Sequence, residues 1–317
     1  MRDLYISMYH YTRDLKHSRY PRIQGLDVSL FDKQIEFLSS TFNVVTMEQV
    51  IDAVMNNGEL PERALLLTFD DGYADNYTFA LPILEKYKVQ GSFFIPGKTF
   101  AEHKLLNVNK IHYILAAADI NELVKDLKKE MDYYRGREFD YAPTDELYQQ
   151  YAVANRFDCG DIIFVKRILQ TALPEKLRDT ISSKLFAKYI DVNEEQLAYE
   201  LYMTEDQVRT MKRHGMHIGI HGYDHYWLAN LTKDELQRDI SLALDTLDEF
   251  VDRKKWVMNY PYGNYSDDVI DYIKDKGAVL GLSTKVNVAN LDRDNRYALP
   301  RLDCNDYPPK SENYKNY

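Results

Sequence analysis

Hydrophobic and polar positions over the first hundred residues predict short strands that alternate with amphipathic helices. The run "RALLLTF" at 63–69 is almost continuously apolar, which is typical of a strand buried on both faces of a parallel sheet. Residues 29–41 instead place apolar side chains three and four positions apart, which is the spacing of one helix face. The other predicted strands are 4–10 and 91–97, and the other predicted helices are 47–58 and 77–89, the last with a kink or a late start at Pro82. This β–α–β order indicates a parallel sheet or barrel wrapped in helices.

The pattern changes in the middle of the chain and then returns. Residues from about 103 to 210 are charged and mostly helical in period, and no strand pattern clearly interrupts them. The strands predicted after this stretch are 216–221, 256–263 with a turn, and 278–283, separated by helices at 233–252 and 267–277. We therefore expect one α/β domain over 1–305, a helical insertion within it at about 103–210, and a loose polar tail at 306–317.

Composition and charge narrow the possible partners. The chain has 317 residues, of which 45% are hydrophobic and 28% charged, so a packed core is expected. Lysine and arginine total 40 and aspartate and glutamate 50, and 40 − 50 gives a net charge of −10. This balance argues against nucleic acid or an anionic membrane as the main partner.

Location is predicted from the hydrophobic runs at the start of the chain and within it. No apolar run approaches the ~18 residues of a membrane span, and the start "MRDLYISMYHYTRDLKH" lacks the apolar segment of a signal peptide. The sequence as it stands predicts a cytoplasmic protein. The two isolated cysteines, Cys159 and Cys304, predict neither a disulfide framework nor a cysteine zinc site, and we expect both to be small core residues.

Two adjacent carboxylates follow the buried run at 63–69. Asp70 and Asp71 would point to opposite faces of a continuing strand, but a turn at Gly72 lets both reach one pocket. In β/α barrels the catalytic residues lie at the C-terminal ends of the strands. The alternative is that one aspartate caps a helix, a position that aspartate favours.

Histidines supply a second candidate group. His221 ends the predicted strand 216–221, and His225 lies four residues later in the following loop. Two such imidazoles with a carboxylate and open positions are typical of a catalytic metal site, although chance spacing of two ordinary histidines is the alternative. His217 is expected to pack or form hydrogen bonds rather than bind metal.

Three weaker signals lie elsewhere in the chain. Pro261-Tyr262-Gly263 predicts a tight turn, and such a turn can aim a backbone N–H into a cleft where an oxyanion forms. His10 near the end of the first strand is a candidate general acid or an ordinary histidine. Arg301 and Asp303 share a face of a strand, so they either pair with each other or orient a catalytic carboxylate and histidine.

Taken together, these motifs resemble the polysaccharide deacetylase family, carbohydrate esterase family four, with its NodB-homology domain. Residues 68–72 match the first motif of that family, Thr-Phe-Asp-Asp-Gly, without change. Residues 221–225 match its His-Ser/Thr-x-x-His motif, with Gly222 in place of serine or threonine. Residues 261–263 match the end of its Arg-x-Pro-Tyr-Gly motif, with Asn259 in place of arginine.

The resemblance covers most of 1–102 and 211–305 and excludes the insertion. His10, preceded by Tyr9, resembles a branch that includes poly-N-acetylglucosamine deacetylases, in which the catalytic histidine precedes the first motif. The resemblance implies a distorted (β/α)7 barrel and one divalent metal ion. Zinc is the expected ion, and cobalt, nickel or manganese could take its place. The resemblance implies that the metal ligands are Asp71, His221 and His225.

The resemblance also implies roles for the other candidates. Asp70 corresponds to the general base and His10 to the acid, and Tyr262 supplies the backbone N–H that binds the oxyanion. Arg301 and Asp303 correspond to orienting residues, with Arg301 expected to replace the missing motif-three arginine beside Asp70.

The leading hypothesis is therefore a metal-dependent hydrolase that removes an N-acetyl or N-formyl group from an amino sugar in cell-surface glycan biosynthesis. The substrate is expected to be a carbohydrate, including nucleotide-linked or lipid-linked sugars. The alternatives are an amidohydrolase that acts on a non-sugar amide and a carbohydrate-binding relative that has lost catalysis.

Overall fold

The structure is a computed structural model that describes residues 2–317, and the chain divides into two compact units. The barrel unit consists of the residues up to Asp14, Gly25–His103 and Glu200–Tyr317, and the helical unit consists of Leu15–Gln24 and Lys104–Tyr199. The helical unit thus differs from the expected insertion at about 103–210. Residues 200–210 belong to the barrel unit because α11 (Glu205–Arg213) packs on β7 (His217–Ile220), and 15–24 join the helical unit.

The main sheet of the barrel unit follows the order β10-β1-β5-β6-β7-β8-β9, with β4 beside β5 and β11 beside β1. Every pair in this sheet is parallel except β1 with β10. The remaining strands of the sheet are β1 (Asp3–Tyr9), β4 (Asn43–Val44), β5 (Ala64–Phe69), β6 (Gly91–Ile95), β8 (Trp256–Asn259), β9 (Ala278–Leu282), β10 (Ala289–Asn290) and β11 (Leu302–Asp303). A separate pair is formed by β2 (Thr12–Arg13) and β3 (Leu26–Asp27).

One segment joins the two ends of the curled sheet. Leu299 pairs with Leu282 at the end of β9, and β11 pairs in parallel with Ser7 and Met8 of β1. The segment from Leu299 to β11 therefore bridges the first and last strands. The barrel unit is a distorted (β/α)7 barrel, which confirms the expected fold class.

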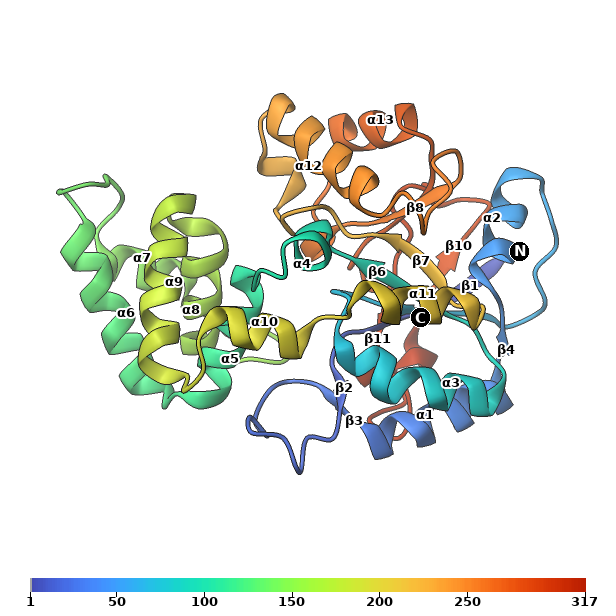
Figure 1. Cartoon of the computed structure of the whole chain (residues 1–317), viewed down its shortest axis with the longest axis horizontal. Helices are drawn as coiled ribbons and strands as arrows, with labels where there is room; N and C mark the ends of the chain where they lie inside the picture. The colour runs from blue at the N-terminus through green and yellow to red at the C-terminus, as the bar shows by residue number, and fades with distance from the viewer. Residues whose placement is uncertain (1) are drawn as a thin grey trace. The chain divides into compact units, whose positions relative to one another are not determined.

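Helices cover the outside of this sheet, and Figure 1 shows α1 and α3 below the strands and α12 and α13 above them. The helices of the barrel unit, besides α11, are α1 (Val28–Thr41), α2 (Met47–Met55), α3 (Leu81–Tyr87), α4 (Gly97–Ala101), α12 (Lys233–Thr246) and α13 (Asp267–Asp275). Pro82 lies in the first turn of α3, directly after a π-helical turn at Asn76–Ala80. The backbone is already helical before Pro82, so of the two expectations the late start is wrong and the structure has a local irregularity at the π-helical turn instead.

Both faces of the strands are buried, as the continuous apolar runs predicted. In β5, Leu65, Leu67 and Phe69 enter the cluster that packs under the outer helices, while Ala64 and Leu66 enter a second cluster. All six residues of β5 are buried. Successive side chains of a strand alternate between faces, so a strand with apolar residues throughout requires cover on both sides.

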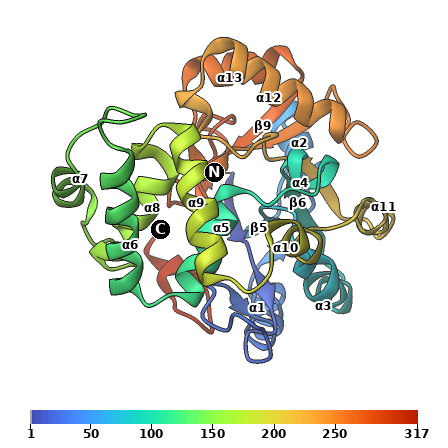
Figure 2. The same cartoon turned by 60° about the vertical axis from the view of Figure 1, so that its left-hand side comes forward.

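The helical unit is built from antiparallel and crossing helices around its own core. Figure 2 shows α6, α8 and α9 side by side, and α6 is in direct contact with both α8 and α9. Its helices are α5 (Asn107–Ala117), α6 (Ile120–Tyr134), α7 (Thr144–Tyr151), α8 (Gly160–Arg167), α9 (Glu175–Tyr189) and most of α10 (Glu194–Leu201). Arg22 ties the segment 15–24 to this unit by donating to the carbonyls of Ala116 and Ala117 at the end of α5.

Two expectations about exposure are wrong. Residues 306–317 are not a loose tail, because Tyr314 is buried and its ring stacks on Tyr307. Cys159 is not a core residue, because it is exposed, whereas Cys304 is half-buried and packs against the main hydrophobic cluster; neither forms a disulfide. None of the helices within 2–317 combines the length and apolarity that a bilayer crossing requires.

Candidate metal centre and active site

The turn after β5 places two carboxylates together. The backbone of Asp71 (φ 74°) and Gly72 (φ 67°) is left-handed, so the chain reverses directly after Asp70. A Cβ atom on Gly72 would lie 3.0 Å from Ile95, which favours glycine there. Both aspartates are buried, and their contacts go to the side chains of other motifs rather than to a helix N-terminus.

The structure brings the three predicted metal ligands together. One donor atom from each of Asp71, His221 and His225 lies within 4.8 Å of the other two. Nε2 of His221 and Nε2 of His225 lie 3.3 Å and 3.2 Å from Oδ1 of Asp71. All three side chains are buried at the carboxyl ends of β5 and β7.

The surroundings of these donors suit a divalent cation. Oδ1 of Asp71 is buried and accepts no hydrogen bond, which leaves a negative oxygen without a donor. Burial lowers the pKa of His225, so its imidazole is neutral and can act as a ligand. One carboxylate and two imidazoles are a donor set typical of zinc and related first-row ions.

Two outer contacts fix the orientation of these ligands. The Tyr73 hydroxyl donates to Oδ2 of Asp71 at 2.5 Å, which turns Oδ1 toward the histidines. Nδ1 of His221 lies 2.6 Å from the backbone oxygen of Asn259, and only a protonated Nδ1 can donate there. Nε2 of His221 therefore carries the free lone pair.

The loop that carries His225 is held in place by hydrogen bonds to α12. Gly222 and His225 adopt left-handed backbone conformations (φ 68° and 58°). Asp239 of α12 accepts the backbone N–H groups of Tyr223 and Asp224 at 2.9 and 2.8 Å. Burial outweighs these two bonds and raises the pKa of Asp239 to about 6.

Asp70 lies in a separate polar pocket beside the ligands. Arg301 binds it through two parallel contacts of 2.8 and 2.9 Å, and Asn259 donates to the same carboxylate at 2.5 Å. Nε2 of His10 lies 3.8 Å from Asp70, and the His10 side chain is partly exposed. Burial would raise the pKa of Asp70, but the Arg301 guanidinium and the nearby His10 hold it below its ordinary value.

The turn at 261–263 lies next to His225. Tyr262 has a left-handed backbone (φ 58°) inside the turn, and its ring centroid lies 4.8 Å from that of His225. The ring of Trp227 stacks on that of Tyr262, with the ring centroids 4.7 Å apart. The predicted turn is therefore present and lies beside the candidate ligands.

Some predicted contacts are present and others are not. His217 lies 3.0 Å from a carboxylate oxygen of Glu48, which confirms its predicted hydrogen bond. Asp303 accepts bonds from the backbone and side chain of Asn305, and within 2–317 it forms no ion pair or hydrogen bond with Asp70 or His10. Asp303 therefore lacks the contacts that an orienting residue would need.

Sequence reasoning missed the contacts of Tyr73, Asp239 and the side chain of Asn259. Tyr73 directly follows the first motif, and that position is its only signal in the sequence. Asp239 lies within a helix of many charges, and nothing in its spacing separates it from its neighbours. Asn259 stood out only as a departure from the family pattern.

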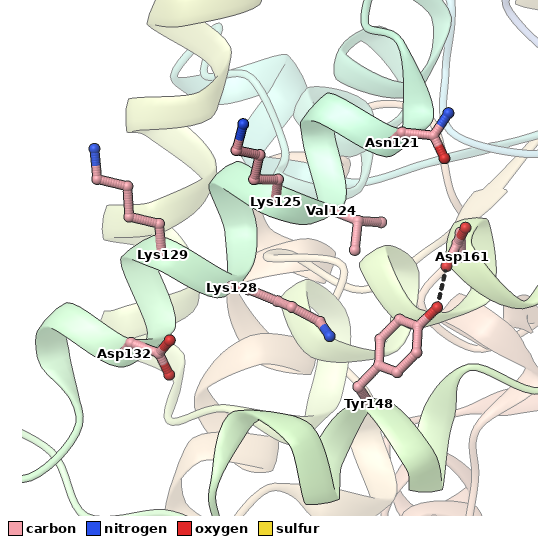
Figure 3. A pocket seen from close by; sticks show the side chains of 8 residues that line it. All are labelled: Asn121, Val124, Lys125, Lys128, Lys129, Asp132, Tyr148 and Asp161. Carbon is pink, nitrogen blue, oxygen red and sulfur yellow. Dashed lines mark hydrogen bonds between the residues drawn. The ribbon is translucent and has the colours of Figure 1, made fainter.

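A cavity of about 610 Å³ lies in the helical unit and contains none of these residues (Figure 3). Its lining is Asn121, Val124, Lys125, Lys128, Lys129, Asp132, Tyr148 and Asp161. Tyr148 donates to Asp161 at 2.5 Å, and Lys128 covers the Tyr148 ring at 3.8 Å and approaches Asp145. The carboxylate of Asp161 is thus held by a tyrosine hydroxyl, and Lys128 pairs with a carboxylate outside the lining.

Fold and site together define an α/β barrel that carries an Asp–His–His set at the carboxyl edge of its sheet. The sequence matches the family described as Polysaccharide deacetylase over residues 57–132 and 153–281, which is more than half of the chain. The chain therefore belongs to the polysaccharide deacetylase family, as the motifs predicted.

Individual relatives have low sequence identity to this chain, but their alignments cover most of it. The putative polysaccharide deacetylase YxkH of Bacillus subtilis (strain 168) is 19% identical over 298 residues, which are 94% of this chain and 70% of that protein. The Streptococcus pyogenes deacetylase PplD in complex with acetate superposes with a TM-score of 0.59 at 18% identity, covering 99% of this chain and 96% of that one. IcaB from Ammonifex degensii gives 0.57 at 18% identity, with the same coverage of 99% and 96%. At these identities the solved structures support the fold.

Proposed function

We propose that this protein is a metal-dependent hydrolase that removes an N-acetyl or N-formyl group from an amino sugar of a cell-surface glycan or its precursor. The observation that carries the proposal is the buried set of Asp71, His221 and His225 beside a second, separately held carboxylate, Asp70. Membership of the polysaccharide deacetylase family supports a carbohydrate substrate. Polymeric, nucleotide-linked and lipid-linked sugars are the substrates to compare.

The proposed ligands are Asp71, His221 and His225, with zinc as the first choice and cobalt, nickel or manganese as substitutes. When bound, such an ion polarises an acyl carbonyl and lowers the pKa of water from ~16 to about 7. The chain itself supplies the remaining chemistry. Asp70, ionised because Arg301 holds its pKa low, is the proposed acceptor of the proton of the attacking water.

The positions of two other candidates support roles for them in amide hydrolysis. His10 lies 3.8 Å from Asp70 on the exposed side of the pocket, from which it can give a proton to the leaving amine. The backbone N–H of Tyr262, held in a left-handed turn beside His225, is the proposed oxyanion donor.

The surroundings of Asp70 favour catalysis over an inactive carbohydrate-binding relative. The departure at Asn259 is one of two reasons to consider loss of activity, and the other is the identity of the acid. Arg301 approaches Asp70 in a buried, two-pronged ion pair, so an arginine lies beside the proposed base although motif three lacks one. We propose orientation of Asp70 as the role of Arg301.

The test combines metal analysis with two neighbouring substitutions. Purified protein is loaded with zinc or cobalt and assayed for acetate and formate release from N-acylated hexosamines in free, nucleotide-linked and polymeric form. Asp70→Asn should lower kcat by about 10² to 10⁴ with metal retained, since it removes a general base. Asp71→Asn should weaken metal binding itself.

The matched control is Asp32→Asn, an exposed carboxylate that pairs with Lys86. It should leave both metal binding and turnover unchanged. A loaded protein that releases no acyl group from any sugar but hydrolyses non-sugar amides would contradict the proposed substrate class. Protein that binds no divalent ion would contradict the proposed reaction.

A further inference from the structure

We propose that Asn259 is a positioning residue that links the proposed base Asp70 to the proposed metal ligand His221, so that one residue sets the geometry of both. The inference rests on the proposed function and goes beyond it. It also assigns a role to Asn259, the residue at which this chain departs from the family motif.

Asn259 uses its side-chain amide and its backbone for three different partners. Its Nδ2 donates to Asp70 at 2.5 Å, and its Oδ1 accepts from Nη2 of Arg301 at 3.0 Å. Its backbone oxygen lies 2.6 Å from Nδ1 of His221. The residue is completely buried, so bulk water does not compete for these contacts.

The position of Asn259 in the sheet explains why one residue reaches both groups. It is the last residue of β8, and β8 lies between β7, which leads to His221, and β9. Met258 pairs with Ile220 of β7, so the backbone oxygen of Asn259 lies beside the residue after Ile220, which is His221. Its side chain meets the pocket of Asp70 and Arg301.

The chemistry of the partners selects an amide. An ionised Asp70 can only accept a hydrogen bond and Arg301 can only donate one, so the bridging group must donate to the first and accept from the second. This requirement also fixes which end of the amide faces which partner. Aspartate has the same shape but cannot donate when ionised, and its charge would repel Asp70 and compete for Arg301.

Two substitutions separate this role from simple space filling. Asn259→Ala removes the side-chain bridge but keeps the backbone oxygen, so kcat should fall about 100-fold, the cost of misplacing a catalytic group. KM and the Co²⁺ dissociation constant should change by less than ~3-fold, since binding groups are intact. Asn259→Asp preserves the shape, and its kcat should be no higher than that of Asn259→Ala.

The control variant is Asn287→Ala, an exposed asparagine outside the site, which should match the unchanged protein. Milder damage from Asn259→Asp than from Asn259→Ala would overturn the bridge, since shape alone would then explain the loss. Unchanged kcat in both variants would overturn it as well.

A measurement that needs no turnover tests the contact with His221. In ¹⁵N-histidine NMR spectra of metal-free protein, His221 should carry its proton on Nδ1, and Asn259→Ala should leave this tautomer in place. Protonation on Nε2 would overturn the backbone contact. Absence of both Co²⁺ binding and acyl release in the unchanged protein would instead refute the proposed function, while the NMR result would still decide the contact.

Discussion

At the scale of single residues, Tyr73 is the contact most directly tied to the proposed ligands. Its hydroxyl donates to Oδ2 of Asp71 at 2.5 Å, inside a stack of rings formed with Tyr11 and Tyr202. The stack holds the Tyr73 ring in place, so phenylalanine should keep the packing and lose only the hydroxyl. The contact therefore orients Asp71 without touching the pocket of Asp70.

We predict that Tyr73→Phe weakens Zn²⁺ binding by about 10- to 100-fold, the usual effect of removing an outer-shell partner of a ligand. At saturating zinc, kcat should stay within ~3-fold of the unchanged enzyme because Asp70 keeps its partners. Competition titration with a chromogenic chelator measures the affinity. Tyr265→Phe, at a partly exposed ring, is the control, and equal affinity in both variants would contradict the prediction.

The residues of the site differ in how readily the sequence reveals them. Asp70, Asp71, His221 and His225 belong to motifs whose spacing already indicates metal chemistry, and the structure does bring the last three together. Asn259 acts through contacts with Asp70, Arg301 and His221 that exist only once β5, β7 and β8 are side by side. Tyr73 acts through one local hydrogen bond to Asp71, two residues earlier, that depends on the conformation of the turn. Such contacts leave no periodic or spacing signal in a single sequence.

At the scale of elements, the loop from His221 to His225 depends on α12. Asp239 anchors this loop, and burial raises the pKa of its carboxyl from 3.8 to about 6. An acid with a raised folded-state pKa binds its proton more tightly in the folded chain than in the unfolded one. Its contribution to stability is therefore complete below pH ~4 and is lost as pH rises through about 6.

We predict that the stability difference between the unchanged protein and Asp239→Asn changes with pH. The unchanged protein should lose about 2.5 kcal/mol relative to the variant between pH 4 and pH 7.5, since one pKa unit corresponds to about 1.4 kcal/mol and part of the shift has already taken effect at pH 4. Urea unfolding of metal-free protein, followed by tryptophan fluorescence, measures this. Both tryptophans, Trp227 and Trp256, lie in the barrel unit, so the signal reports on the unit that contains Asp239. A difference that stays constant with pH would contradict the assigned titration.

Element prediction succeeded where local chemistry determines the outcome. The apolar run of β5 and the helical spacing around α3 are local signals, and a strand and a helix formed there, although the helix does not start late at Pro82. The segment 306–317 was mistaken for a tail because its composition is polar. Tyr314 nevertheless packs against Tyr307 and Phe42, a long-range contact that composition does not reveal.

At the scale of the whole molecule, the two units differ in what a bound metal can do to them. The proposed ligands all belong to the barrel unit, although Asp71 and the two histidines are separated in sequence by the helical unit. The boundaries of that unit could not be predicted, because the recruitment of 15–24 depends on contacts such as Arg22 with the end of α5. A cation that joins β5 to the loop after β7 should therefore stabilise one unit selectively.

We predict that metal-linked protection is confined to the barrel unit. At free Zn²⁺ of about 100 times the dissociation constant, mass action stabilises the binding unit by about 2.7 kcal/mol. Hydrogen exchange should slow in peptides that cover 64–72 and 217–226, and exchange within 104–199 should change little. The same experiment with Asp71→Asn should show no slowing in either unit, because one of the three ligands is impaired. Equal slowing across both units of the unchanged protein would mean that they open as one cooperative body, and slowing that persists in Asp71→Asn would place the bound metal elsewhere.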